Sequence, residues 1–153
     1  MYSIRNATEE DIPGILQIER EAISPPWTHG TLLSEIYRED SFFAITEHGA
    51  LPLTAHEPQL SGFVILRQMG DEGELLQIAV DKAMRRRGAA DALIGAVLLY
   101  AGENTLKSVF LEVRKSNDAA IALYKKHGFE SVRIRKDYYI NPVEDATVMA
   151  RDL

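Results

Sequence analysis

Apolar residues recur along this chain at two spacings, every three to four positions in some stretches and in short runs elsewhere. The first spacing is typical of helices that bury one face. It predicts four helices: from the N-cap residue Thr8 to near Ser24, after the second cap Thr28, from Gly88 to near Gly102, and from Asn117 or Ser116 to Lys126.

The short apolar runs are typical of strands, and with the helices they give the order β-α-α-β-β-β-α-β-α-β-β. Antiparallel strands come first and βα units follow. We therefore expect one α/β domain over residues 1–153, with a mixed, mostly antiparallel central sheet and helices on both faces. The segment Glu47 to Ser61 is predicted to be a surface loop. The predicted strands are Tyr2 to Arg5, Ser41 to Thr46, Gly62 to Arg67, Glu74 to Val80, Ser108 to Val113, Glu130 to Tyr139 and Asp145 to Ala150.

The composition excludes several classes of function. The chain has no cysteine, which rules out disulfides, thiolate metal sites and an acyl-cysteine intermediate. Its four histidines lack the close spacing of metal ligands, so no metal is expected. A net charge of −6 argues against nucleic-acid binding and mildly favours a basic partner. No apolar run approaches the about 18 residues of a membrane span, and the N-terminus lacks a signal-peptide pattern, so we expect a cytoplasmic protein without a membrane partner.

A basic turn joins the apolar strand 75–80 to the third predicted helix. Arg85, Arg86 and Arg87 precede Gly88, which opens the helix. Backbone N–H groups, the positive end of the helix dipole and three arginines meet there, and together they favour an anion site, most often for phosphate. The same residues alone are also compatible with a solvated turn. The patterns of a P-loop and of a Gly-x-Gly-x-x-Gly dinucleotide site are both absent from the sequence.

Two further features each allow two interpretations. Glu112 interrupts an apolar strand and Tyr124 follows twelve residues later on the next helix, so they are either a surface glutamate and a core tyrosine or a catalytic pair. Trp27, the only tryptophan, follows Pro25-Pro26. It is either an aromatic plug in a loop or a wall for a peptide substrate.

The basic turn before the third predicted helix and the segment that contains Glu112 and Tyr124 both resemble one known family. The turn Arg85-Arg86-Arg87-Gly88-Ala89-Ala90 fits Arg/Gln-x-x-Gly-x-Gly/Ala and resembles the pyrophosphate-binding turn of the GCN5-related N-acetyltransferases (GNAT). Many members have glycine where this chain has Ala90, and alanine keeps the turn small. The segment 111–129 reads Leu-Glu-Val-Arg-x-Ser-Asn-x-x-Ala-Ile-x-Leu-Tyr-x-x-x-Gly-Phe and resembles the RimI-type ribosomal-protein-alanine N-acetyltransferases. The resemblance covers nearly the whole chain except residues 47–61.

The resemblance implies the GNAT fold, acetyl-CoA as cosubstrate and roles for individual residues. Glu112 would be the general base and Tyr124 the general acid. The backbone of Ile78, Ala79 and Val80 would pair with the pantetheine arm of the cosubstrate and stabilise the oxyanion. The remaining implied contacts are Arg85, Arg86, Arg87, Gly88, Ala89, Ala90 and Asp91 around the pyrophosphate, Asn117 on the cosubstrate, and Trp27, Tyr138 and Tyr139 at the acceptor.

The chemistry agrees with an N-terminal acceptor. Acetyl transfer needs a neutral amine, and an α-amino group has a pKa of about 7.7–8.0 against about 10.4 for lysine. We therefore expect an acetyl-CoA-dependent N-alpha-acetyltransferase that works by direct transfer in a ternary complex, with the N-terminal alanine of a small-subunit ribosomal protein as acceptor. The alternatives are a GNAT enzyme for another amine and a non-catalytic CoA-binding module. The presence of both Glu112 and Tyr124 counts against the module.

Overall fold

The computed structural model describes residues 2–48 and 59–153, and its strands and helices follow the predicted order. Two single-turn 3-10 helices, η1 (Glu9–Asp11) and η2 (Lys82–Met84), accompany them. The elements are β1 (Tyr2–Asn6), α1 (Ile12–Ala22), α2 (His29–Ile36), β2 (Ser41–His48), β3 (Gln59–Met69), β4 (Glu72–Val80), α3 (Ala89–Glu103), β5 (Ser108–Arg114), α4 (Asp118–Lys126), β6 (Glu130–Tyr139) and β7 (Glu144–Asp152).

Several predicted boundaries differ from the structure by a few residues, and two of the differences have a clear physical reason. The expected loop 47–61 is strand at both ends, because the end of β2 pairs with β1 and the start of β3 pairs with β2. Residues 49–58 of that loop lie outside the described residues. Helix α1 ends at Ala22 instead of near Ser24, because the chain is already extended at Ile23 (φ −117°, ψ 132°) as it approaches Pro25-Pro26.

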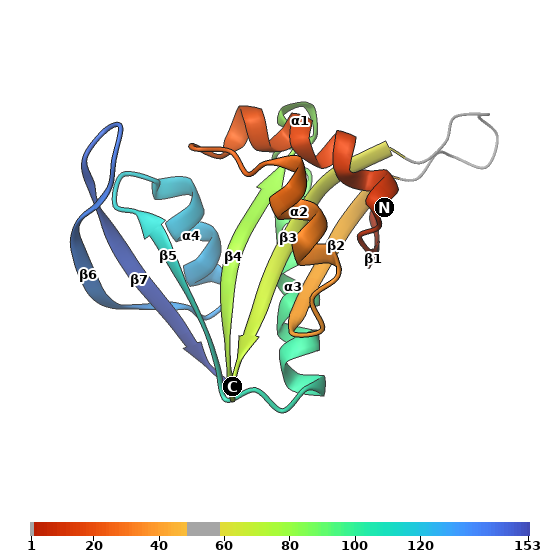
Figure 1. Ribbon diagram of the computed structural model, residues 1–153. Helices are drawn as coiled ribbons and strands as arrows, with labels where there is room; N and C mark the ends of the chain where they lie inside the picture. The colour runs from red at the N-terminus through yellow and green to blue at the C-terminus, as the bar shows by residue number, and fades with distance from the viewer. Residues whose placement is uncertain (1, 49–58) are drawn as a thin grey trace.

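The seven strands form one sheet in the order β1-β2-β3-β4-β5-β7-β6 (Figure 1). Only β4 and β5 run parallel, and every other neighbouring pair is antiparallel. The predicted mixed, mostly antiparallel sheet is therefore confirmed.

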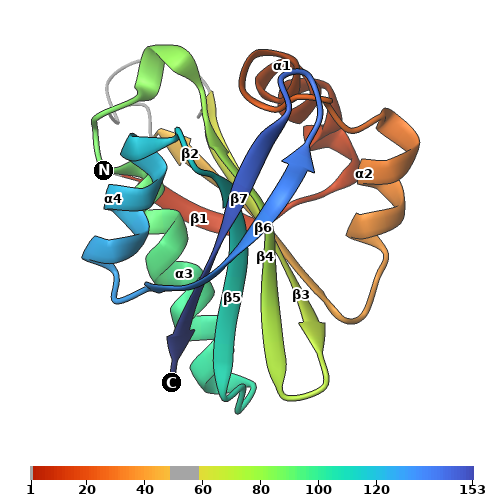
Figure 2. The ribbon, with the colours of Figure 1, turned by 90° about the vertical axis from the view of Figure 1, so that its left-hand side faces the viewer.

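Helices cover both faces of the sheet, as predicted (Figure 2). Helices α3 and α4 pack on one face, where Leu93 and Tyr124 join strand residues such as Leu111 in one apolar cluster. Helices α1 and α2 pack on the other face, where Ile15 and Leu32 belong to a second cluster. The sheet thus separates two cores, and we call its two sides the α3/α4 face and the α1/α2 face.

The parallel pair β4–β5 comes apart halfway along its length. The strands are paired from Glu72 and Ser108 to Leu75 and Leu111, and beyond that point they diverge (Figure 1). At the same level β4 has a bulge at Leu76, because its neighbours Leu75 and Gln77 pair with consecutive residues of β3. The far half of β4 is therefore hydrogen-bonded to β3 on one side only.

Candidate active site

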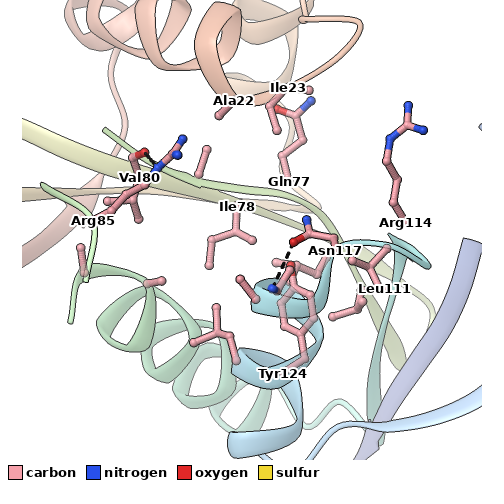
Figure 3. A pocket seen from close by; sticks show the side chains of 18 of the residues that line it. Ala22, Ile23, Gln77, Ile78, Val80, Arg85, Leu111, Arg114, Asn117 and Tyr124 are labelled. Atoms are coloured by element: carbon pink, nitrogen blue, oxygen red, sulfur yellow. Dashed lines mark hydrogen bonds between the residues drawn. The ribbon is translucent and has the colours of Figure 1, made fainter. Parts of the chain in front are cut away.

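A cavity of about 730 Å³ opens in the split between β4 and β5. Side chains from β4, β5, α4 and the end of α1 surround it (Figure 3). Most of the predicted site residues lie on its wall. These are Ile78, Ala79, Val80, Arg85, Arg86, Gly88, Ala89, Ala90, Asp91, Glu112, Asn117, Tyr124 and Tyr139.

Three predicted site residues are not on this wall. Arg87 is exposed in the turn outside it. Tyr138 packs edge-on against Tyr139, with ring centroids 5.0 Å apart, and does not itself line the cavity. Trp27 packs against the apolar cluster under α1 and α2. The structure therefore supports the interpretation of Trp27 as an aromatic plug, because its ring is occupied within the protein.

The diverging half of β4 supplies a free strand edge to the cavity. Ile78, Ala79 and Val80 pair with β3 on one side, and β5 no longer pairs with them on the other. Alternate N–H and C=O groups of a strand point toward each neighbour, so a half-paired strand presents unused groups along one edge. Such an edge can bind an extended molecule as if that molecule were an additional strand.

The turn before α3 presents backbone N–H groups to the same cavity. Arg86 and Gly88 both have positive φ, at 63° and 88°, and alternating backbone of this kind gathers N–H groups into an anion-binding concavity. Arg85 steadies the turn, because its Nε donates to the carbonyl oxygen of Val80 at 3.4 Å. Ala89 and Ala90 begin the helix without bulky side chains, so an anion can approach the N–H groups of the first turn.

Asp91 is on the wall, but its side chain is engaged by α4. Its Oδ1 accepts from Lys126 Nζ at 2.9 Å and lies 2.8 Å from His127 Nε2. The hydrogen bond from Lys126, with a smaller contribution from His127, holds the pKa of Asp91 below its usual range. The negative charge of this carboxylate is thus compensated beside the anion-binding turn.

Glu112 lies on β5 where the strands separate, and Arg135 of β6 donates to its carboxylate. The same guanidinium lies 5.0 Å from the centre of the Tyr138 ring. Burial and the negative charge of Glu112 raise the pKa of Glu74 on β4. Glu112 therefore presents a carboxylate at the split, and a carboxylate in this place can accept a proton from an ammonium group.

Tyr124 approaches the cavity from α4, where it is buried beside Phe129 (Figure 3). Burial raises the pKa of its phenol well above the usual range. Burial, followed by the charge of Glu112, raises the pKa of Tyr139 to about 12. Both phenols on the wall therefore stay protonated at neutral pH and can donate hydrogen bonds.

Asn117 caps α4, which settles the choice between Asn117 and Ser116. Its Oδ1 accepts from the backbone N–H of Ala120 at 3.2 Å (Figure 3). The cap uses only the amide oxygen. The amide nitrogen can therefore still donate to a molecule in the cavity.

The sequence interpretation missed several residues of the site. Gln77, Ile23, Ser24 and Arg114 line the cavity, and Arg135 holds the Glu112 carboxylate. Gln77 left a signal, because it is a polar residue within an otherwise apolar strand. The other four gave none, because their place depends on contacts between elements that are distant in sequence.

Two other features are absent from the described residues. Within them, no three His, Cys, Asp or Glu side chains come together as a metal site would need. None of their helices combines the length and the apolar character needed to cross a membrane.

A free strand edge next to an anion-binding turn suits an extended, phosphate-bearing ligand, and the carboxylate and phenol at the split suit proton transfer beside it. Residues 12–129 match the model of the acetyltransferase (GNAT) family. The chain belongs to this family. It is an acetyl-CoA-dependent N-acetyltransferase, with acetyl-CoA as its cosubstrate.

Individual relatives agree over nearly the whole chain. The [ribosomal protein bS18]-alanine N-acetyltransferase of Escherichia coli strain K12 is 33% identical over 98% of this chain and 97% of its own length. An N-alpha-acetyltransferase of Sulfurisphaera tokodaii is 33% identical over 99% and 93%. The crystal structure of the Escherichia coli ribosomal-protein-S18-alanine N-acetyltransferase superposes with a TM-score of 0.86 at 31% identity, covering 99% of this chain and 94% of that one. The GNAT fold expected from the sequence is confirmed.

Proposed function

We propose that this enzyme is an N-alpha-acetyltransferase and that its acceptor is the N-terminal alanine of a small-subunit ribosomal protein. The broader part, acetylation of protein N-termini, is supported by the names of relatives from Escherichia coli and Sulfurisphaera tokodaii. The finer part is supported by the group of relatives named for alanine of ribosomal protein bS18. A ribosomal acceptor also implies that the enzyme works in the cytoplasm. We further propose that residues 1–153 form a single N-acetyltransferase domain.

One observation carries the catalytic part of this proposal, namely that Glu112 and Tyr124 reach the split from opposite faces of the sheet. Leu111 and Val113 belong to the core under α3 and α4, so the alternation of a strand directs Glu112 to the α1/α2 face. Tyr124 belongs to α4 on the α3/α4 face. An amine can therefore approach on one face while the thiol leaves on the other, as direct transfer requires.

In this proposal Glu112 is the general base and removes a proton from the amine, directly or through one water. The free edge of β4 over Ile78, Ala79 and Val80 binds the pantetheine arm and stabilises the negative charge that develops on the acetyl oxygen. Tyr124 donates its phenolic proton to the departing sulfur. Acetyl-CoA supplies the activated acetyl group.

The rest of the cosubstrate is assigned to the α3/α4 face. The N–H groups from Arg86 to Asp91 bind the pyrophosphate, and Arg85 contributes positive charge at the rim. The amide nitrogen of Asn117 donates to the cosubstrate. The small size of Ala89 and Ala90 allows this close approach of backbone to phosphate.

An α-amino acceptor suits a site with a single carboxylate as base. An N-terminal amine is partly neutral near pH 7.5, because its pKa is about 7.7–8.0, whereas only about 0.1% of a lysine side chain is neutral there. Tyr139, which lines the cavity, and its neighbour Tyr138 border the acceptor side in this proposal. The net charge of −6 is compatible with a basic ribosomal-protein tail.

The test is intact-mass measurement of three matched peptides incubated with acetyl-CoA and the enzyme. The first peptide has the N-terminal sequence of the ribosomal protein, beginning with alanine and containing lysines. The second is the same peptide with a blocked N-terminus, and the third begins with a bulky residue instead of alanine. We expect one added acetyl group on the first peptide, none on the second and much less on the third. Acetylation of the blocked peptide would contradict the N-terminal assignment, and equal rates on the first and third would contradict the preference for alanine.

A further inference from the structure

A buried polar network joins α1, the loop after it and β4. Glu19 of α1 has no exposed surface, and its Oε2 accepts from the backbone N–H of Trp27 at 3.2 Å. In the amide orientation that its neighbours require, the side-chain nitrogen of Gln77 donates to Oε1 of the same carboxylate. The amide oxygen of Gln77 accepts from Trp27 Nε1 at 3.0 Å. Gln77 thus joins two residues of the distant segment 19–27, and the three satisfy one another inside the α1/α2 core.

A carboxylate at this position costs free energy. Burial raises the pKa of Glu19, and the hydrogen bonds from Trp27 and Gln77 oppose that shift only in part. Ile15 and Ile18 on the same helix are buried in the apolar cluster, and an apolar side chain at position 19 would avoid the cost of burying a charge. Glu19 is not on the cavity wall, so it can affect a bound molecule only through the groups that it contacts.

The network around Glu19 reaches the cavity wall through Gln77. Gln77 lines the cavity and directly follows the bulge of β4 where the strands diverge. Ile23 and Ser24 also line the cavity, and they belong to the segment between Glu19 and Trp27. Figure 3 shows Gln77 reaching from β4 toward Ala22 and Ile23. The network therefore fixes the distance between the strand edge and the loop that faces it.

We propose that Glu19 is a positioning residue for the acceptor, acting through Gln77 and Trp27 to hold residues 23–27 against β4. This wall is on the α1/α2 face, the face to which Glu112 is directed. The inference rests on the proposed function in one respect, because there the acceptor amine reaches Glu112 from this face. Loosening the network should therefore weaken acceptor binding and leave the acetyl-CoA side intact.

The direction of the hydrogen bonds provides a sharp test. A carboxylate only accepts, so Glu19 can satisfy both the Trp27 N–H and the Gln77 amide. Glu19→Gln places an amide N–H group against one of these donors, and Gln77→Glu places two carboxylates together. The reciprocal double variant Glu19→Gln with Gln77→Glu restores every bond. In the double variant the side chain at position 19 accepts from the backbone N–H of Trp27 and donates to the side chain at position 77. The side chain at position 77 still accepts from the indole Nε1 of Trp27.

The experiment compares the two single variants, the double variant and Glu21→Gln, an exposed control on the same helix. Steady-state assays give the KM for the alanine peptide and for acetyl-CoA separately. Because Trp27 is the only tryptophan, its fluorescence reports the network directly, and thermal unfolding shows that each variant is folded. We expect each single variant to raise the peptide KM about fivefold, the effect of one lost buried hydrogen bond, with a shift of the indole emission. The acetyl-CoA KM should change less than twofold, and the double variant should recover both the peptide KM and the emission.

Two outcomes would overturn the inference. One is a shifted emission in the single variants with an unchanged peptide KM, which would make the network structural only. The other is a double variant whose peptide KM equals the combined effect of the single variants. The parent enzyme in the same assay tests the proposed function separately. If the parent acetylates another amine instead of the peptide, the proposed acceptor is wrong, and the KM comparison is made with that amine.

Discussion

The two faces of the split offer a ligand different kinds of contact. On the α3/α4 face the contacts offered to a ligand are mainly backbone, namely the free edge of β4 and the turn with positive φ at Arg86 and Gly88. On the α1/α2 face they depend on side chains, such as the Arg135–Glu112 pair and the network around Glu19. Backbone contacts suit a ligand that never changes, because few substitutions alter them. Side-chain contacts can be exchanged, so this face is where we expect acceptor preference to be set.

The largest effect should come from Glu112→Gln, which removes the proposed base and keeps the shape. We expect kcat to fall about 10²- to 10⁴-fold, with an unchanged dissociation constant for acetyl-CoA. Steady-state kinetics and calorimetric titration measure the two quantities. Glu130→Gln, an exposed change at the start of β6, serves as the charge-matched control. An undiminished kcat would remove Glu112 from the base role.

The second-largest effect should come from Gly88→Val, which should weaken ligand binding on the α3/α4 face and leave the α1/α2 face unchanged. A β-branched residue at φ 88° is strained, and relief of the strain would turn the N–H groups away from the cavity. We expect acetyl-CoA to bind about 100-fold more weakly, which corresponds to about 2.7 kcal/mol. Gly95→Val in the exposed middle of α3 is the control, because nothing lies within 4 Å of its added Cβ and its φ is not positive. Equal losses at both positions would show that helix propensity alone explains the result.

Tyr124→Phe should reduce kcat by about tenfold, below the usual range for a general acid, because a thiol of pKa about 8.5 is already a good leaving group. The pH dependence is a second test. Burial raises the pKa of Tyr124, so the proton that it donates stays bound above the ordinary phenol pKa of 10.0. If the kcat of the parent enzyme falls at alkaline pH below 10, Tyr124→Phe should therefore show the same fall. A fall near pH 8 that is lost in the variant would contradict the assignment.

The smallest effect separates neighbouring arginines. Arg85 lines the cavity and Arg87 does not, although both belong to the same basic turn. We expect Arg85→Gln to weaken acetyl-CoA binding a few-fold at low salt, with the difference shrinking as salt screens the charge. Arg87→Gln removes the same charge outside the wall and should have little effect. If both variants lose the same affinity, the turn acts through its overall charge and not through position.

The backbone-built face was largely predictable from the sequence. Gly88, with small residues after it and an apolar strand before it, indicated the turn through local conformational preference alone, and the order of strands and helices followed from apolar spacing. The side-chain face was not predictable in this way. Arg135 meets Glu112 only because β7 lies between β5 and β6 in the sheet, and Gln77 meets Glu19 only after α1 packs on β4. Trp27 shows the same limit, since its ring is directed by a partner that is fifty residues away.

Hydrogen exchange, measured with and without acetyl-CoA and with the alanine peptide, tests the division between the two faces most directly. The account predicts that acetyl-CoA slows exchange of residues 76–80 and 86–91, where the free edge and the turn acquire partners, and leaves β6 unchanged. The peptide should add protection at Ile23, Ser24 and Trp27, the residues of this segment that have a backbone N–H. Protection by acetyl-CoA confined to β6 or to the loop after α1, with β4 unaffected, would contradict the placement of the cosubstrate in the split.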